Sequence, residues 1–109
     1  MRNIIFLLLV SCSNVYARSF TCEIQENTVT VFKTEIESRA GQKVNVGEAS
    51  GVRTFLTEKS NHYFEIEAFI PDVPARSYAE SQLSLPGDAL TLTFWGREQL
   101  MALKCYILQ

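Results

Sequence analysis

The stretch HYFEIEAFI, residues 62–70, decides the fold class, because apolar and polar side chains alternate along it. A period of two residues is typical of a β-strand with one face in the core and the other in solvent. The pattern predicts that one set of side chains points inward: Phe64, Ile66, Ala68 and Ile70. It predicts that the side chains between them point outward: Tyr63, Glu65 and Glu67. The strand is expected to end at Pro71, since proline has no N–H to give to a β-ladder.

Alternation of this kind continues on both sides of the stretch, and no segment after residue 17 keeps a helical period. Further strands are predicted over residues 20–25, 28–37, 43–46, 53–58, 78–85, 89–95 and 100–108. The phase of the second strand slips at Val31 and Phe32, which predicts a β-bulge there. About seven or eight short strands are typical of a small antiparallel β-barrel or β-sandwich. We therefore expect an all-β fold, with residues 18–109 as a single domain.

The first residues, MRNIIFLLLVSCSNVYA (1–17), have the layout of a secretory signal peptide. Arg2 gives a positive start, residues 4–10 are apolar, and Val15 and Ala17 suit a cleavage site. The apolar run is too short to span a bilayer. A second interpretation is a lipoprotein processing site over residues 9–12, with Cys12 lipidated. Either way the domain is predicted to be exported, periplasmic or secreted, and to contact a membrane only if Cys12 carries lipid.

Two cysteines, Cys22 and Cys105, lie near opposite ends of the predicted domain. Each shares its parity with apolar neighbours, so both sulfur atoms are expected to point into the core. An even number of cysteines in an exported domain favours a disulfide over free thiols. Two cysteines and a single histidine make a poor zinc site, so no metal is predicted. The sequence therefore predicts a Cys22–Cys105 bridge that closes the fold.

A turn signal, LPGD at residues 85–88, separates two predicted strands. If Ser84 pairs with Ala89, the hairpin sets Tyr78 opposite Trp95 on the outer side. Continuing the ladder would set Arg76 opposite Arg97, and facing arginines suit an anionic or planar group between them. Tyrosine, tryptophan and arginine are also enriched at interface hot spots. We predict a binding site at these four residues; the plainer interpretation is a Tyr–Trp pair that only stiffens the hairpin.

Candidates for catalysis are few. His62 is the only histidine, and beside a polar turn it is expected to be an ordinary solvated side chain. Glu65 and Glu67 lie two positions apart on one face, about 6.5–7 Å, which is close to the spacing of a glycosidase pair. Alternate charged residues are also what any solvent-facing strand carries. Gly-rich phosphate loops, HExxH and GxSxG motifs are absent from the sequence. We therefore predict no catalytic residue and no cofactor.

The charge balance argues against one class of partner. The chain has a net charge of −2. Among residues 1–17 the one charged residue is Arg2, so the domain without them is more acidic. Nucleic-acid-binding domains are basic, so no nucleic acid partner is expected. The expected partner is a protein or a glycan. The sequence as a whole predicts a small exported non-enzymatic β-domain, an envelope-associated or secreted binding or structural protein.

Three segments resemble a family of small bacterial inhibitors of lysozyme, the membrane-bound c-type class. They are FTCE at 20–23, ASGVRTF at 49–55, and Phe94 with Trp95. The gap between the last two segments is longer here than in that family. The resemblance implies an exported, disulfide-closed β-barrel that inhibits a foreign hydrolase. It also implies that the inhibitor loop contains Ser50, Gly51 and Arg53.

Overall fold

The computed structural model describes residues 18–60, 62–95 and 100–108. These residues form eight β-strands and no helix, which confirms the all-β prediction. The strands are β1 (Arg18–Glu26), β2 (Val29–Ser38), β3 (Lys43–Ala49), β4 (Val52–Ser60), β5 (Tyr63–Ile70), β6 (Ala75–Gln82), β7 (Ala89–Trp95) and β8 (Leu100–Ile107). The predicted signal peptide, residues 1–17 with Cys12, lies outside the described residues.

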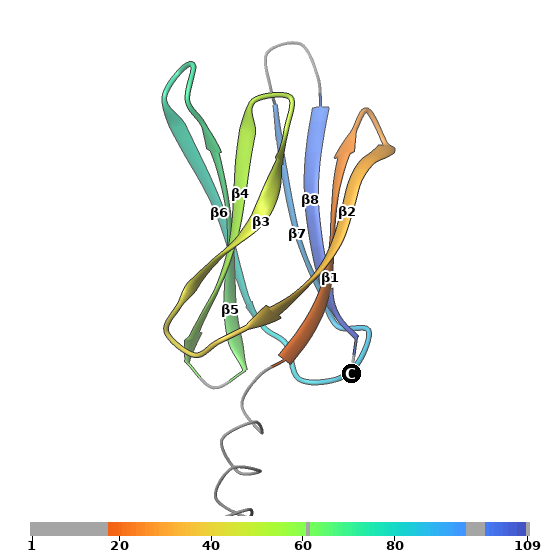
Figure 1. The fold of residues 1–109 in the computed structure, drawn as a ribbon, viewed down its shortest axis with the longest axis vertical. Helices are drawn as coiled ribbons and strands as arrows, with labels where there is room; N and C mark the ends of the chain where they lie inside the picture. The colour runs from red at the N-terminus through yellow and green to blue at the C-terminus, as the bar shows by residue number, and fades with distance from the viewer. Residues whose placement is uncertain (1–17, 61, 96–99, 109) are drawn as a thin grey trace, which may run out of the picture.

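The strands build two antiparallel four-stranded sheets, in the orders β2-β1-β8-β7 and β3-β4-β5-β6. The two sheets face each other as the layers of a sandwich (Figure 1). Along the described strands no ladder joins β2 to β3 or β6 to β7, so the sheets do not close into a barrel. Of the two architectures that the sequence left open, the structure is the sandwich. The barrel that the inhibitor resemblance implies is therefore wrong.

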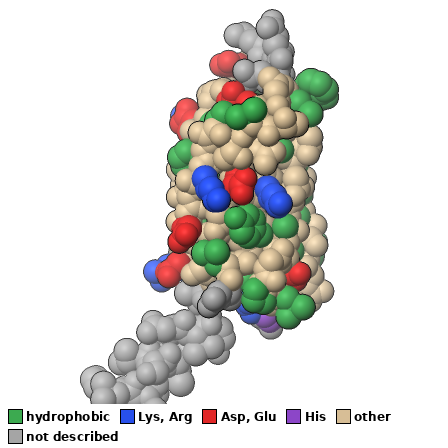
Figure 2. Space-filling view, turned by 90° about the vertical axis from the view of Figure 1, so that its right-hand side faces the viewer, with side chains coloured by type: hydrophobic (Ala, Val, Ile, Leu, Met, Phe, Trp, Pro, Cys, Tyr) green, Lys and Arg blue, Asp and Glu red, His purple; other side chains and the backbone are tan. Residues whose placement is uncertain are grey.

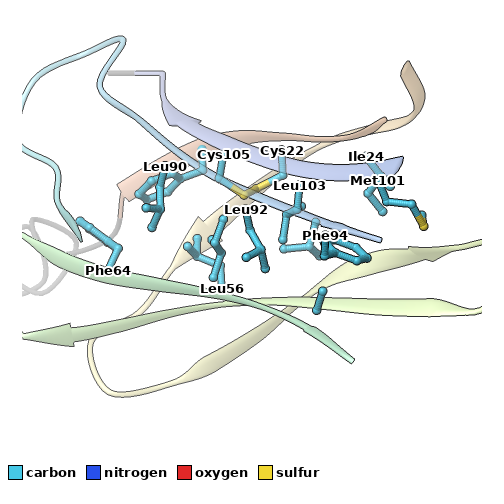
Figure 3. Close-up of a cluster of buried hydrophobic side chains, with 14 of the residues drawn as sticks. Cys22, Ile24, Leu56, Phe64, Leu90, Leu92, Phe94, Met101, Leu103 and Cys105 are labelled. Atoms are coloured by element: carbon cyan, nitrogen blue, oxygen red, sulfur yellow. A yellow bond between two sulfur atoms is a disulfide. The ribbon is translucent and has the colours of Figure 1, made fainter. Parts of the chain in front are cut away.

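The core lies between the sheets and is built from the inward parity of each strand, as predicted for β1, β5 and β8. Phe20 of β1 and Phe64 of β5 meet edge to face across it, with ring centroids 4.9 Å apart. Figure 3 shows core side chains such as Phe64, Leu92 and Leu103 between the layers, with the disulfide among them. Burying one such apolar side chain stabilises the fold by about 1.5–3 kcal/mol.

The predicted disulfide is confirmed. Cys22 of β1 and Cys105 of β8 are direct cross-strand partners, and their sulfur atoms are bonded. Both residues are fully buried (Figure 3). The bridge therefore ties the first strand to the last in the middle of one sheet, across a sequence separation of 83 residues.

The predicted bulge is also confirmed. Ile24 pairs with Phe32 and Gln25 pairs with Thr30, which leaves Val31 as the extra residue on β2. The bulge sits where β2 passes β3 of the other sheet. There the Phe32 ring packs against Gly47, and a Cβ at Gly47 would overlap that ring. Gly47 also has a φ of +154°, a backbone conformation that other residues rarely adopt, so a side chain here would be both crowded and strained.

The connections alternate between the two ends of the sandwich (Figure 1). The β1–β2, β3–β4 and β5–β6 turns lie at one end, and the β2–β3 and β6–β7 connections at the other. At the second end Ser38 donates a hydrogen bond to the buried Glu58 carboxylate over 3.3 Å. Gly41 N–H donates to the Glu58 carbonyl over 2.8 Å, so the β2–β3 corner is held against β4. A search of the described residues for a helix long and apolar enough to cross a bilayer finds none.

Candidate functional site

Arg76 and Tyr78, two residues of the predicted binding site, lie on the outer face of the β3-β4-β5-β6 sheet. β6 alternates more exposed with less exposed positions, and Tyr78 is 52% exposed. In the β5–β6 ladder Arg76 is opposite Phe69, and Tyr78 is opposite Glu67. We call the outer surface of this sheet the aromatic–basic face.

Glu67 is the centre of this face. The sequence predicted that it points outward, which is correct, but its side chain is only 3% exposed. Lys43 Nζ lies 2.9 Å from one carboxylate oxygen, and Arg76 contacts the other. Lys43 also lies 5.0 Å from the centroid of the Phe55 ring, and Arg76 lies 4.4 Å from that of Phe69. Both basic side chains are therefore held between a buried carboxylate and an aromatic ring.

The pKa of Glu67 follows from these contacts. Burial alone would raise the pKa, because it disfavours the charged carboxylate. The hydrogen bonds and charges of Lys43 and Arg76 outweigh burial, so the pKa of Glu67 lies below its ordinary value. Glu67 is thus an ionised anchor that fixes two cations on the surface.

A second ionic cluster lies further along the same face. Lys59 Nζ is 3.3 Å from Glu80 and 3.8 Å from Glu65, and Tyr63 donates a hydrogen bond to Glu80 over 2.8 Å. Glu65 and Glu80 are direct cross-strand partners, so their negatively charged carboxylates repel each other. Burial and the neighbouring Glu80 raise the pKa of Glu65. The Tyr63 hydroxyl and other hydrogen bonds lower the pKa of Glu80.

Glu65 and Glu67, considered above as a carboxylate pair, belong to different clusters. Glu67 is held by Lys43 and Arg76, whereas Glu65 interacts with Lys59 and Glu80. A search of the described residues finds no group of three metal-ligating side chains.

The predicted hairpin between β6 and β7 is wrong, because the two strands lie in different sheets. The connection is anchored at both ends to other elements. Leu83 N–H donates to the His62 carbonyl at the β4–β5 turn, whereas Gly87 N–H donates to the Ile107 carbonyl on β8. Asp88 accepts hydrogen bonds from the Ser84 and Leu85 amides, which closes a turn within the connection itself. The LPGD turn signal was therefore correct, but the turn crosses between layers.

Trp95 is consequently not opposite Tyr78. Its cross-strand partner is Leu100, and it alternates with buried Phe94, which places it on the outer surface of the other sheet. Trp95 is 72% exposed. Arg97, the fourth residue of the predicted site, lies outside the described residues. The structure thus separates Arg76 and Tyr78 from Trp95.

The residues of the suggested inhibitor loop are also divided. Ser50 and Gly51 form the exposed β3–β4 turn, with φ values of +51° and +79°. The Ser50 hydroxyl donates to Glu26 of β1. Arg53 instead lies on β4, and its cross-strand partner on β5 is Phe69. The aromatic–basic face therefore has a row in which Arg53, Phe69 and Arg76 lie side by side on three adjacent strands.

His62 is not the freely solvated side chain that the sequence suggested. Arg18 Nη2 donates a hydrogen bond to His62 Nδ1 over 2.7 Å, which links β1 to the β4–β5 turn. His62 itself has a φ of +64°. This pair lies at the opposite end of the sandwich from the β3–β4 turn (Figure 1).

Sequence reasoning missed Lys43, Phe55 and Phe69 as members of the face. Their outward parity was readable from the alternation, but their convergence on Glu67 and Arg76 depends on the order of strands. Comparison with protein-family models, curated proteins and solved structures finds no match for this chain.

Proposed function

We propose that this chain is an exported binding domain without catalytic chemistry of its own, and that the aromatic–basic face recognises its partner. The observation that carries the proposal is the row of Arg53, Phe69 and Arg76, with exposed Tyr78 beside it. The Arg76 guanidinium lies over the Phe69 ring and is held in place by Glu67, and Arg53 is the cross-strand neighbour of Phe69 on its other side. A preorganised arginine loses less side-chain entropy when it binds.

The chemistry of the face suits a protein surface that presents an acidic side chain. Lys43 and Arg76 share the single charge of Glu67, and Arg53 adds another cation whose cross-strand partner on β3 is Glu48, so these five residues together keep one net positive charge. Arginine can hold a carboxylate through two parallel hydrogen bonds. Phe69 and Tyr78 supply apolar contact area next to it, the combination typical of protein interface hot spots.

Export is supported by the leader sequence and by the disulfide, since disulfides persist in oxidising compartments. β1 begins at Arg18, so cleavage after Ala17 would leave the first strand intact. The mass of the mature amino terminus distinguishes that cleavage from lipidation at Cys12.

The binding proposal is tested with matched substitutions on the two sheets. A photo-crosslinking residue at Tyr78, compared with one at Trp95, identifies the partner in the producing cell. The partner's affinity is then measured for Arg53→Glu and Tyr78→Ala, with Lys33→Glu and Val29→Ala, both on β2, as controls on the other sheet. We expect the first two changes to weaken binding by more than about tenfold and the controls to leave it within about twofold.

Equal effects of both pairs, or an effect of the control pair alone, would contradict the assignment of the face. A partner that proves to be a glycan would contradict the proposed partner class.

The hydrolase-inhibitor alternative rests on one observation, the exposed Ser50–Gly51 turn at the end of the β3–β4 hairpin (Figure 1). Its test is lysozyme activity in the presence of the purified protein. Inhibition that is lost on replacing residues of this turn would support it, whereas full lysozyme activity at large excess would exclude this target.

A further inference from the structure

The sandwich has four edge strands, and one of them lacks the usual protection. Natural proteins guard exposed edges against foreign strands with charged residues, prolines or bulges. Among the edge strands, β2 and β3 each carry a bulge and charged residues, and β6 carries Arg76 and Glu80. β7, with the sequence ALTLTFW, has no charge, no proline and no bulge. Four of its residues, Thr91, Thr93, Phe94 and Trp95, are of types enriched in strands.

The outer edge of β7 presents unpaired backbone groups in a regular row. At the start of the strand Ile107 N–H donates to the Asp88 carbonyl. Along an antiparallel strand only every second residue forms backbone hydrogen bonds to a given neighbouring strand. Asp88 bonds to β8, so the even-numbered residues of β7 bond to β8 as well. The backbone groups facing away from β8 then belong to Ala89, Thr91, Thr93 and Trp95. None of the described strands pairs with this edge.

The inward side chains of β7 are buried, though slightly less completely than the rest of the core, and its outward side chains are exposed. Leu90, Leu92 and Phe94 are 6%, 7% and 7% exposed, and every other member of the core is 4% exposed or less. Trp95 is the most exposed of the large apolar side chains among the described residues. The outer face of the strand therefore presents a large apolar side chain to solvent next to its open backbone edge, whereas its inward side chains are buried.

We propose that this edge pairs with the same edge of a second copy of the chain. The two β7 strands run antiparallel about a two-fold axis through Leu92, and two four-stranded sheets join into one continuous sheet. A two-fold interface uses the same patch on both copies, so the patch must complement itself.

The sequence of β7 complements itself in this register. Thr91 is opposite Thr93 of the second copy, a pair that is favourable across strands. On the core side Leu90 meets Phe94 of the second copy, and on the outer side small Ala89 lies opposite large Trp95. In this register Ala89, Thr91, Thr93 and Trp95 form the hydrogen-bonded pairs with the second copy. These are the residues whose backbone groups face away from β8, so the new ladder gives each of these N–H and C=O groups a partner.

The charges on the outer surface of this sheet do not oppose the pairing. The register sets Lys33, Glu23 and Lys104 in a row across β2, β1 and β8. Figure 2 shows such a basic–acidic–basic row across the middle of this side of the molecule. The next residue across is Thr91 on β7, so the row stops one strand short of the edge.

Sedimentation equilibrium of the purified protein tests the proposal. We expect a reversible monomer–dimer equilibrium in the wild type. Four double variants at Thr91 and Thr93 then test the register, because each position is opposite the other in the second copy. Lys/Lys and Glu/Glu place like charges opposite each other twice, and we expect at least about tenfold weaker dimerisation. Glu/Lys and Lys/Glu place opposite charges together, and we expect dimers to remain.

This pattern separates pairing from net charge. The domain is acidic, so two added lysines reduce its overall repulsion and would favour association if net charge decided the outcome. Val31→Lys, on the other edge of the same sheet, is the control for an added charge elsewhere and should leave the dimer unchanged. Both threonines are exposed, so equal melting temperatures at low protein concentration show that the variants fold.

Hydrogen exchange supplies an independent measurement. The amides of Thr91 and Thr93 should become protected as protein concentration rises in the wild type. The proposal would be overturned by a wild-type protein that stays monomeric at every concentration, or by equal dimerisation of the four double variants. It would also be overturned if the Thr91 and Thr93 amides became protected only in the presence of another protein.

Discussion

Breaking the Cys22–Cys105 bridge is expected to remove much of the stability of this domain. The bridge joins residues separated by 83 positions, so it closes a loop that spans nearly the whole fold. Closing this loop lowers the conformational entropy of the unfolded chain and so stabilises the folded state. In the chain-entropy model that amounts to about 4.5 kcal/mol at room temperature. Small domains are stable by about 5–15 kcal/mol, so the reduced protein should be close to unfolding.

The measurement compares urea or thermal unfolding of the oxidised and the reduced wild-type protein. For a domain of this size the expected loss corresponds to roughly 20–35 °C in melting temperature. The oxidised protein should also be lighter by two hydrogen atoms in non-reducing mass spectrometry. Cys22→Ala with Cys105→Ala should melt at or below the reduced wild type, because the core also loses two buried sulfur atoms.

The double alanine variant is the control for the reducing agent, which should not change its unfolding midpoint. The reasoning would be refuted by equal midpoints for oxidised and reduced wild type. Rapid alkylation of both thiols in the folded protein from the producing cell would refute it as well.

Two further predictions concern single contacts. Gly47→Ala should destabilise the fold by about 1–3 kcal/mol, because the new Cβ would overlap the Phe32 ring. In a Phe32→Leu background the same change should cost less. Equal costs of Gly47→Ala in the two backgrounds of this double-mutant cycle would contradict the contact. Glu67→Gln should cost about 1–2 kcal/mol at neutral pH, a value reduced because Lys43 and Arg76 are half exposed. Since the pKa of Glu67 is lowered in the folded state, its contribution is present above the ordinary carboxylate pKa and is lost as the pH falls through the lowered value. Urea midpoints from pH 7 to about 3 should therefore fall more steeply for wild type than for Glu67→Gln, and parallel curves would contradict this role.

Local pattern predicted most of the fold because side-chain parity reports directly on burial. The inward side chains of β1 and β8, the bulge at Val31 and the bridge between Cys22 and Cys105 all follow from alternation along single strands. The pairing of β6 with β7 was wrong because a turn signal shows that the chain reverses, not which sheet it enters. That choice depends on hydrogen bonds to His62 and Ile107, which are distant in sequence.

The candidate site was predictable only in part, for the same reason. Outward parity and residue type singled out Arg76 and Tyr78. The burial of Glu67 was missed because parity gives the face of a strand and not what covers that face. Lys43 reaches Glu67 from β3, across the intervening β4, so the strand order had to be known first.

The two proposed surfaces lie on different sheets, and this separation makes them independently testable. Arg53 and Tyr78 belong to the β3-β4-β5-β6 layer, whereas Thr91 and Thr93 lie on the far edge of the other layer. Between them lies the core, which the Cys22–Cys105 bridge reinforces. Substitutions at exposed positions more than about 7–10 Å apart with no shared partners usually have additive effects. A dimer formed through β7 would therefore present two copies of the aromatic–basic face. Its avidity for a clustered partner should fall in the Lys/Lys variant at Thr91 and Thr93, because that variant dimerises more weakly. The affinity of each single face should stay unchanged.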